Sequence, residues 1–449
     1  MIALENRIDL ATEYQAMTEH LLRAAEAKGA TAAEVDVDKG TGLSVEVRMG
    51  KVDKLQHHND QNVNITVYFG HRKGVASTGD FSKKALDDTL EAACSIARHT
   101  SEDPFNGLAD RADIATEFPK LDLYHPWELD TEQAIEMALQ AETVAREHDH
   151  RITNSEGAGV DSFAGLHLYA NTYGFMGIRH STRHSMSCAV VAQDGDSMQR
   201  DYWYTVSRVP SLLDSADTVG AEAAQRALRR LHARSLSTRE APVLFVPRMA
   251  RGLIEGLIAA LSGGAQYRKA TFLLNSLGQQ VCPDFLQVRE DPLIRQALSS
   301  RAYDSEGVAC RPRDIVKDGI IQDYFLSSYS ARKLGMKTTG SAGGTSNILV
   351  GDTGVSFVDL IQQMGTGLMV TELFGHGVNG ITGDYSRGAV GYWIEDGMIQ
   401  HPVEEVTIAG NMKDMLRGIV GIADDVDVRG TVHTGSILID KMTIAGQAS

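Results

Sequence analysis

The stretch Ala241–Gly264, APVLFVPRMARGLIEGLIAALSGG, decides the fold of the C-terminal half of the chain. Residues Val243 to Pro247 are apolar or proline and predict a short buried strand that ends in a turn. The apolar residues after the turn have helical spacing, at Met249, Leu253, Ile254, Leu257, Ile258 and Leu261. Gly263 and Gly264 are expected to end the helix, because glycine tolerates the left-handed conformation found at helix C-termini. The pattern therefore predicts a core helix behind a buried strand.

The predicted helix carries few groups that could perform chemistry. Its only ionisable residues are Arg248, Arg251 and Glu255, so it holds no pair of metal-binding histidines. After this helix, residues 239–449 contain one further helical pattern, over Val355–Met364, and are otherwise short strand patterns and glycine-rich loops. We therefore expect a C-terminal domain that is mostly β, a sandwich or barrel-like sheet with one buried apolar helix.

The N-terminal half alternates between helical and strand patterns. Helical spacing covers residues 9–28, 82–100, 131–149 and 216–232, and strand alternation covers 33–79 and 152–205. Glycines at 42, 50, 70 and 74 are expected to separate antiparallel strands in the first strand region. Residues 101–130 are rich in proline and aspartate and indicate a connecting segment. The fold class is α+β, with an N-terminal domain over 1–238 in which 1–100 and 125–238 are candidate modules.

Composition limits the classes of function. The 449 residues carry 43 Lys and Arg against 59 Asp and Glu, a net charge of 43 − 59 = −16, which argues against general binding of nucleic acid or anionic membranes. The four cysteines are scattered, without a CxxC pair, as is typical of a reducing compartment. The first residues lack a signal-peptide pattern, and no apolar run is long enough to span a membrane. We expect a cytoplasmic protein.

A second stretch, Thr371–Gly388, holds five glycines among polar residues, TELFGHGVNGITGDYSRG. Glycines this close together indicate backbone that needs positive φ or that approaches another group closely. One interpretation is a loop that lines a peptide groove, and the other is a tight β-corner capped by a histidine. On the first interpretation, the candidate groove residues are Gly375, His376, Asn379, Asp384, Tyr385 and Arg387.

Other motifs are weaker. The glycine-rich run Thr338–Asn347 lacks both nucleotide-binding fingerprints. His180 and His184 are four residues apart in a strand pattern, which places them about 13 Å apart, too far to share a metal ion. No HExxH, GxSxG or CxxC motif is present. The residues alone therefore predict no catalytic centre and no metal site.

Several longer segments, taken together, resemble a known family. They are RITNSEGAGVDS (151–162), STRHS (181–185), YRKATFLLNSLGQQV (267–281), DSEGV (304–308), SSYSARKLG (327–335), TGSAGG (339–344), TGDYSRGAVGYWIEDG (382–397) and EEVTIAGNMKDML (404–416). In this order they resemble the PmbA/TldE branch of the TldD/PmbA family, whose members were named as modulators of DNA gyrase and are regarded as metalloprotease subunits. The resemblance covers essentially the whole chain.

The resemblance implies a cytoplasmic zinc peptidase built from a TldD subunit and a TldE subunit, which acts on unfolded peptides. In the TldD branch, the first helix of the C-terminal domain carries an HExxxH motif, and a later cysteine completes the zinc site. Here Ile254 and Ala259 align with the two histidines, and Glu255 is the remnant of the motif. An alignment shifted by one residue would place Glu255 and Ala260 at those positions. The segment aligned with the cysteine reads VHTGS, residues 432–436, and has no thiol.

The departure from the motif predicts that this chain has no catalytic residue and no metal of its own. Zinc is expected in a TldD-like partner, and Glu255 is expected to pair with Arg251 one turn earlier on the helix. Two alternatives stay open: a self-sufficient metallopeptidase that works as a homodimer, and a binding protein that modulates gyrase without proteolysis.

Overall fold

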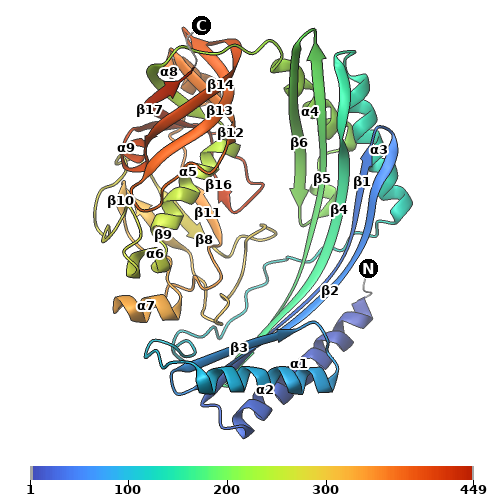
Figure 1. Cartoon of the computed structure of the whole chain (residues 1–449), viewed down its shortest axis with the longest axis vertical. Helices are drawn as coiled ribbons and strands as arrows, with labels where there is room; N and C mark the ends of the chain where they lie inside the picture. Colours follow the sequence, from blue (N-terminus) through green and yellow to red (C-terminus); the bar gives the residue numbers. More distant parts are fainter. Residues whose placement is uncertain (1–3, 447–449) are drawn as a thin grey trace.

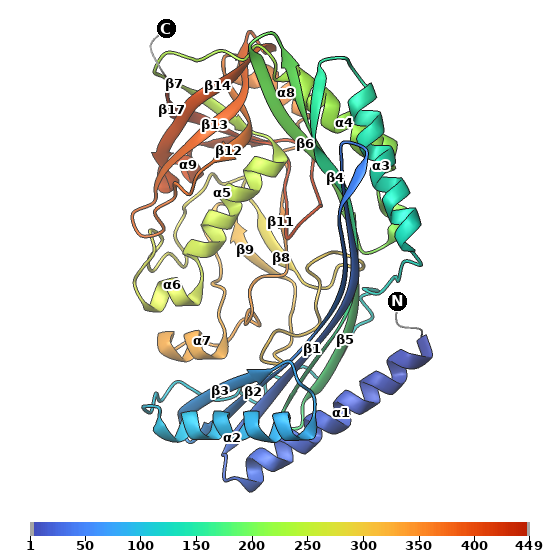
Figure 2. The ribbon, with the colours of Figure 1, turned by 45° about the vertical axis from the view of Figure 1, so that its right-hand side comes forward.

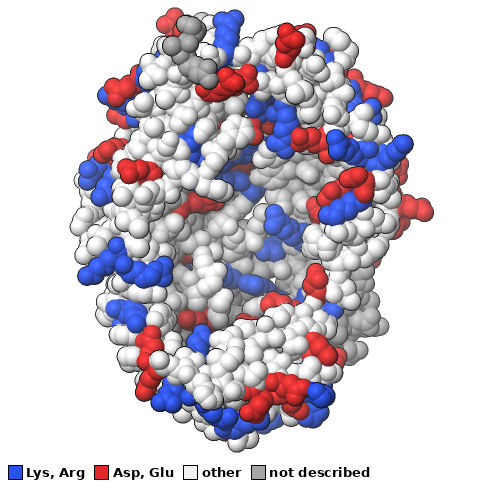
Figure 3. Space-filling view, in the orientation of Figure 1, with Lys and Arg blue, Asp and Glu red and all other residues white. Residues whose placement is uncertain are grey.

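The computed structural model describes residues 4–446, with side chains from residue 11 onward. A long curved sheet forms the N-terminal half, and its concave side faces a compact C-terminal half (Figure 1). The space-filling view in the same orientation shows a hollow between the two halves, in which basic side chains gather (Figure 3).

The N-terminal sheet has six antiparallel strands in the order β3-β2-β1-β4-β5-β6. Their bounds are β1 Ala32–Arg48, β2 Lys51–Phe69, β3 Arg72–Thr78, β4 Ile152–Asn171, β5 Met176–Asp194 and β6 Ser197–Ser207. Because β1 pairs with β4, the strands of the two candidate modules form one continuous sheet. Gly42 and Gly74 were predicted to lie between strands, and this prediction is wrong, because Gly42 lies inside β1 and Gly74 inside β3. Each allows a close contact instead: a Cβ at Gly42 would lie 2.3 Å from the Phe163 ring, and one at Gly74 would lie 2.1 Å from the Ala93 carbonyl oxygen.

Four helices cover the outer face of this sheet (Figure 2). They are α1 Leu4–Ala27, α2 Lys83–His99, α3 Thr131–Glu147 and α4 Ala216–Arg229. Helices α1 and α2 pack on one end of the sheet and α3 and α4 on the other, each pair with its own apolar core. Strand side chains alternate between the two faces, so the residues between these core positions point into the hollow. The hollow is therefore lined by the polar face of the sheet.

The C-terminal half is built around a closed sheet. The strands run in the order β14-β13-β12-β7-β17-β15, and an additional pairing of β14 with β17 closes the ring. Their bounds are β7 Arg239–Phe245, β12 Gly367–Phe374, β13 Asp384–Glu395, β14 Met398–Asn411, β15 Ile419–Ile422 and β17 Ile437–Ala445. A smaller sheet of five strands is made of β8 Val288–Asp291, β9 Arg313–Lys317, β10 Ile320–Ile321, β11 Asn347–Val350 and β16 Val432–His433. The α+β class and the barrel-like C-terminal half are thus confirmed.

The core helix expected from the sequence is α5, Pro247–Ala260, which follows β7 and packs inside the largest apolar cluster. The remaining helical segments are η1 Pro210–Leu212, α6 Gly263–Tyr267, α7 Ser328–Leu334, α8 Phe357–Met364 and α9 Met412–Arg417. The predicted stop at Gly263 and Gly264 is wrong, because these residues begin α6 after the cap Ser262. Gly263 is needed for packing, since a Cβ there would lie 2.4 Å from the Ser330 hydroxyl. No helix among residues 4–446 is long and apolar enough to cross a membrane.

Polar contacts join the two halves. Arg230, the C-cap residue of α4, forms ion pairs with Asp201 of β6 and with Glu372 of β12. The Arg429 guanidinium donates a 2.6 Å hydrogen bond to the main-chain oxygen of Tyr204. These contacts tie the free edge of the curved sheet to the C-terminal half.

Candidate functional site

Helix α5 carries the three residues that align with the family's zinc motif. Ile254 is fully buried in the apolar core, whereas Glu255 and Ala259 are exposed. The three side chains therefore do not face one common point. The helix begins at Pro247, which has no N–H to satisfy, and Val246 precedes it without a side-chain cap.

The expected pair between Glu255 and Arg251 is not what the structure shows. Arg251 instead forms an ion pair with Asp427, 2.7 Å from Nη2 to Oδ1, and donates a 3.0 Å hydrogen bond to the main-chain oxygen of Arg429. The Asp427 side chain is only 7% exposed, so its attraction to a cation is screened far less than that of the exposed Glu255. This difference in burial explains why the long-range partner replaces the neighbour on the helix.

His433 lies beside this ion pair, in the segment aligned with the family's metal-binding cysteine. Its Nε2 donates to the Gly430 carbonyl oxygen at 3.1 Å. Burial lowers the pKa of His433, the hydrogen bond to Gly430 opposes that effect, and the nearby Arg251 charge lowers the pKa further. Burial therefore favours the neutral imidazole, and the Asp427 carboxylate near it is already bound by the guanidiniums of Arg251 and Arg429.

The residues around α5 do not fit a catalytic zinc. Such an ion needs about three nitrogen, sulfur or oxygen ligands and one open position for water. Ile254 and Ala259 have no lone pair to donate, and Arg251 already places a positive charge beside His433. Throughout the part of the chain that the structure describes, no group of three or more His, Cys, Asp or Glu side chains is placed to hold a metal ion.

The glycine-rich stretch forms the connection between β12 and β13, and two of its candidate residues fold that connection. Asn379 Oδ1 accepts hydrogen bonds from the N–H groups of Ile381 and Thr382, at 3.0 and 3.3 Å. Asp384 Oδ2 accepts a 2.6 Å hydrogen bond from the Thr382 hydroxyl. These contacts support the tight-corner interpretation for Asn379 and Asp384.

The other candidates of this hairpin lie in or next to its two strands. Gly375 and His376 are exposed directly after β12, where Gly375 has a φ of 76° that favours glycine. Tyr385 is buried, and burial raises the pKa of its hydroxyl to about 12. Arg387 reaches α5, where a Cβ on Gly252 would lie 3.9 Å from its Nη1. The structure therefore brings the hairpin and the motif helix together through Arg387.

The sequence reasoning missed the exposed apolar side chains of this hairpin. Phe374, Val378 and Ile381 are 48%, 40% and 61% exposed, so each leaves a large apolar surface in water. The spacing of the glycines predicts an unusual backbone conformation. Which apolar side chains remain exposed to solvent depends on the tertiary structure. Exposed apolar residues next to a candidate groove are suited to contact a peptide or another subunit.

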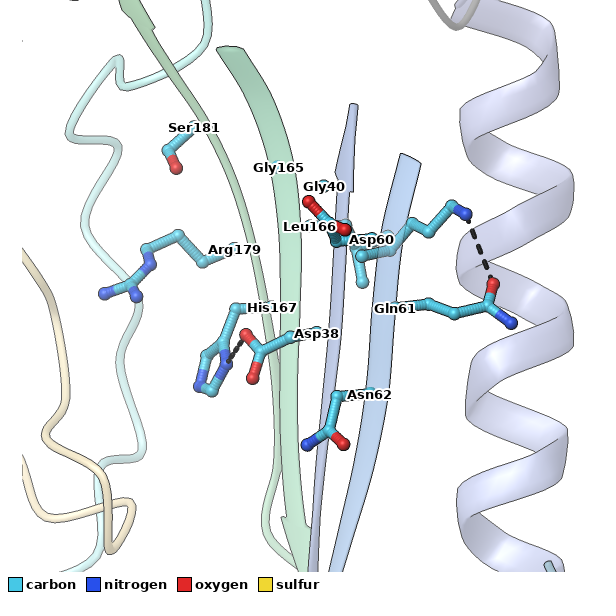
Figure 4. A pocket seen from close by; sticks show the side chains of 11 residues that line it. Asp38, Gly40, Asp60, Gln61, Asn62, Gly165, Leu166, His167, Arg179 and Ser181 are labelled. Atoms are coloured by element: carbon cyan, nitrogen blue, oxygen red, sulfur yellow. Dashed lines mark hydrogen bonds and ion pairs between the residues drawn. The ribbon is translucent and has the colours of Figure 1, made fainter. Parts of the chain in front are cut away.

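A polar pocket on the concave face of the N-terminal sheet was also missed. It has a volume of about 400 Å³, and its lining includes Asp38, His167, Arg179 and Ser181 (Figure 4). Asp38, His167 and Arg179 are direct neighbours across β1, β4 and β5, and His167 Nδ1 lies 2.9 Å from Asp38 Oδ1. Only the strand register, which the sequence does not reveal, assembles these residues.

Comparison with family models matches three successive segments of the chain. The PmbA/TldA metallopeptidase domain 1 matches residues 33–97, the central domain matches 124–231 and the C-terminal domain matches 238–446. Together these segments cover most of the chain.

Individual relatives agree with the family models. The chain is 49% identical to Metalloprotease PmbA of Escherichia coli O157:H7 over 92% of each chain, and 47% identical to a PmbA homologue of Haemophilus influenzae over 93% of each. Among solved structures, a proposed modulator of DNA gyrase from Bacteroides thetaiotaomicron superposes with a TM-score of 0.92 at 26% identity and covers all of both chains. TldE from Thermococcus kodakarensis has the same fold, with a TM-score of 0.80 at 19% identity, over 96% of this chain and all of the other.

Proposed function

The chain belongs to the PmbA/TldD metallopeptidase family, and from this premise we propose that it is the non-catalytic TldE/PmbA subunit of a zinc peptidase that acts on unfolded peptides. Its partner would be a TldD-like subunit that holds the zinc, and the pair would work in the cytoplasm. One observation carries the proposal: the two positions aligned with the family's metal-binding histidines are a fully buried isoleucine, Ile254, and an alanine, Ala259.

Zinc hydrolysis depends on groups that these positions lack. A catalytic zinc lowers the pKa of a bound water toward about 7, and a neighbouring glutamate then takes the proton. Without ligands beside it, Glu255 has no activated water to deprotonate. Its exposed position on α5 is consistent with an ordinary surface charge.

The chain would contribute walls of the peptide groove and contacts to the partner. The hairpin with Gly375, His376 and Arg387 borders α5, and its exposed residues Phe374 and Ile381 offer apolar contacts. Main-chain hydrogen bonds to an extended peptide do not depend on the side chains of the peptide. Such binding would let the enzyme accept unfolded substrates of varied sequence. In this arrangement Asn379, Asp384 and Tyr385 hold the hairpin in shape and do not contact the substrate.

The proposal is tested by peptide hydrolysis with purified proteins. A disordered fluorogenic peptide is incubated with the full chain, with a TldD-like subunit from the same cells, and with both. We expect cleavage to be fastest with both subunits and absent with this chain alone. A mixture no faster than the TldD-like subunit alone would overturn the subunit role. Cleavage by this chain alone, abolished by a chelator, would instead favour the self-sufficient homodimer.

A further inference from the structure

Two glycines face each other in the middle of the curved sheet. Gly40 of β1 and Gly165 of β4 are register partners in the two central strands. A Cβ at Gly40 would meet no atom within 4 Å, and one at Gly165 would meet only the Lys39 carbonyl oxygen, at an ordinary 3.6 Å. Neither glycine has the positive φ that disfavours other residues. Glycine in the interior of a strand lowers the stability of the sheet, and no contact within the chain requires a glycine at either position. These two glycines therefore indicate contact with a molecule outside the chain.

Other glycines of the same sheet have an internal explanation. A Cβ at Gly42 would lie 2.3 Å from the Phe163 ring, and one at Gly177 would lie 2.4 Å from the Tyr303 ring. In those places the protein fills the space above the glycine with its own side chains. Above Gly40 and Gly165 the space stays open and forms the floor of the polar pocket. A glycine in a strand often marks a place where a ligand or another backbone approaches closely.

Arg179 is an unpaired cation among the described residues of this pocket. Arg179, His167 and Ser181 all project from the sheet on the side away from α1 (Figure 4). Among the described residues, the Arg179 guanidinium has no hydrogen bond or ion pair, whereas the Asp38 carboxylate is already engaged by His167. Burial lowers the pKa of Arg179, and the nearby Arg301 lowers it further against the opposing effect of Tyr303. A partly desolvated cation without a partner favours the binding of an anion.

We propose that this pocket is a carboxylate-binding subsite for an extended peptide, whose main chain crosses Gly40 and Gly165 and whose carboxylate binds Arg179. The inference rests on the proposed function in one respect, that the protein handles peptides. Lys39, which also lines the pocket, already donates hydrogen bonds to Asn59 and Gln61, whereas Asp38 and Asp60 are acidic and would repel a phosphate dianion more strongly than a single carboxylate. The carboxylate can be the peptide's C-terminus or an acidic side chain, and both present the same bidentate acceptor to a guanidinium.

Binding of labelled peptides to the full chain, without any partner, tests the subsite. The probes are a dansyl-labelled alanine–serine hexapeptide with a free C-terminus, its C-terminal amide, and the amide with one internal glutamate. Fluorescence anisotropy gives the Kd of each. We expect the free acid to bind at least about tenfold more tightly than the amide, because the charge-assisted hydrogen bonds are lost in the amide. Tight binding of the glutamate peptide instead would identify an acidic side chain as the ligand.

Arg179→Gln and Arg183→Gln form a matched pair. Both remove one positive charge from the same strand and face, but Arg183 does not line the pocket. We expect Arg179→Gln to remove the preference for a carboxylate and Arg183→Gln to retain it. Equal effects of the two variants, or no difference between acid and amide peptides with the unmodified chain, would overturn the subsite.

Gly40→Ala and Gly40→Val test the floor of the pocket independently of charge. Because a Cβ at Gly40 meets no atom, the Tm should not fall, while affinity for all three probes should decrease from Gly to Ala to Val. Unchanged affinity at an unchanged Tm would overturn the placement of the main chain over Gly40. The assay needs no TldD-like subunit, so this inference can fail while the subunit role stands, and the subunit role can fail while peptide binding persists.

Discussion

Arg251 and Asp427 form an ion pair that is largely withdrawn from water, with side chains 13% and 7% exposed and a 2.7 Å distance from Nη2 to Oδ1. The pair connects α5, the helix aligned with the family's zinc motif, to the loop that precedes β16. Asp427 also receives hydrogen bonds from Arg429, so one carboxylate holds two guanidiniums. In this chain, α5 is therefore bordered by a network of ion pairs among Arg251, Asp427 and Arg429.

Removing Asp427 should destabilise the fold. Asp427→Asn leaves Arg251 without its buried partner, and breaking such a pair costs about 3–5 kcal/mol. Urea denaturation gives the change in the free energy of unfolding. The exposed pair of Lys84 with Asp88 provides the control, because Asp88→Asn should cost about 1 kcal/mol or less. Equal small losses in both variants would contradict a stabilising role for the Arg251–Asp427 pair.

The same carboxylate should make stability sensitive to acid. Burial raises the pKa of Asp427, but hydrogen bonds from Arg429 and the charge of Arg251 outweigh burial and hold the pKa below its usual value. A carboxyl with a lowered pKa in the folded state stabilises the protein above the unfolded pKa of about 3.9, and the contribution is lost as the pH falls through the folded value. The destabilisation by Asp427→Asn should therefore shrink below about pH 4. A constant difference between pH 3 and pH 7 would be inconsistent with this assignment.

Asp36 should act in the opposite direction. Burial raises the pKa of Asp36 to about 7, well above the usual range of an aspartate. Its contribution to stability is therefore greatest in acid and is lost as the pH rises through about 7. Asp36→Asn should become more stabilising, relative to the unmodified chain, between pH 5 and pH 8 in urea titrations. The exposed Asp53→Asn on β2 provides the comparison, and a parallel pH trend in both variants would refute the assignment to Asp36.

Ile254 should not tolerate the family's histidine. Ile254→His puts a polar ring into a fully buried apolar site and should destabilise the protein by about 2–5 kcal/mol. Ile254→Val keeps the apolar character and should cost only about 0.5–1.5 kcal/mol. Differential scanning calorimetry compares the two variants. Nearly equal Tm values would mean that the site can accept an imidazole, which would weaken the argument from burial.

Glu255 should be dispensable for hydrolysis by the assembled pair. Glu255→Gln changes one exposed side chain on α5 and should leave the peptidase rate of the mixture unchanged. The equivalent glutamine substitution in the HExxxH motif of the TldD-like subunit is the positive control and should abolish hydrolysis. Loss of activity in both mixtures would place a catalytic glutamate in this chain.

The sequence predicted elements whose pattern is local. Helix α5 is predicted because six apolar residues keep helical spacing, and α8 is predicted by the helical pattern over Val355–Met364. The failures have local and long-range causes. Gly263 begins α6 because the adjacent Ser262 caps that helix, whereas Arg251 pairs with the distant Asp427 and not with its neighbour Glu255.

The candidate site divides in the same way. The glycine-rich hairpin was located by composition, but the fold was needed to separate Asn379 and Asp384, which shape the loop, from Gly375 and His376, which are exposed directly after β12. The pocket around Arg179 depends on the register of three strands, two of them far from β1 in the sequence. No local sequence pattern predicts such a pocket, because the pocket depends on strand register, and the register is set by the packing of both faces of the sheet.

Zinc content measured by native mass spectrometry tests the central claim most directly. The full chain is examined alone, and again after assembly with a TldD-like subunit in the presence of zinc. We expect no stoichiometric zinc on this chain and one zinc for each assembled pair, carried by the TldD-like subunit after dissociation. One zinc bound to each copy of this chain on its own would rule out the non-catalytic role.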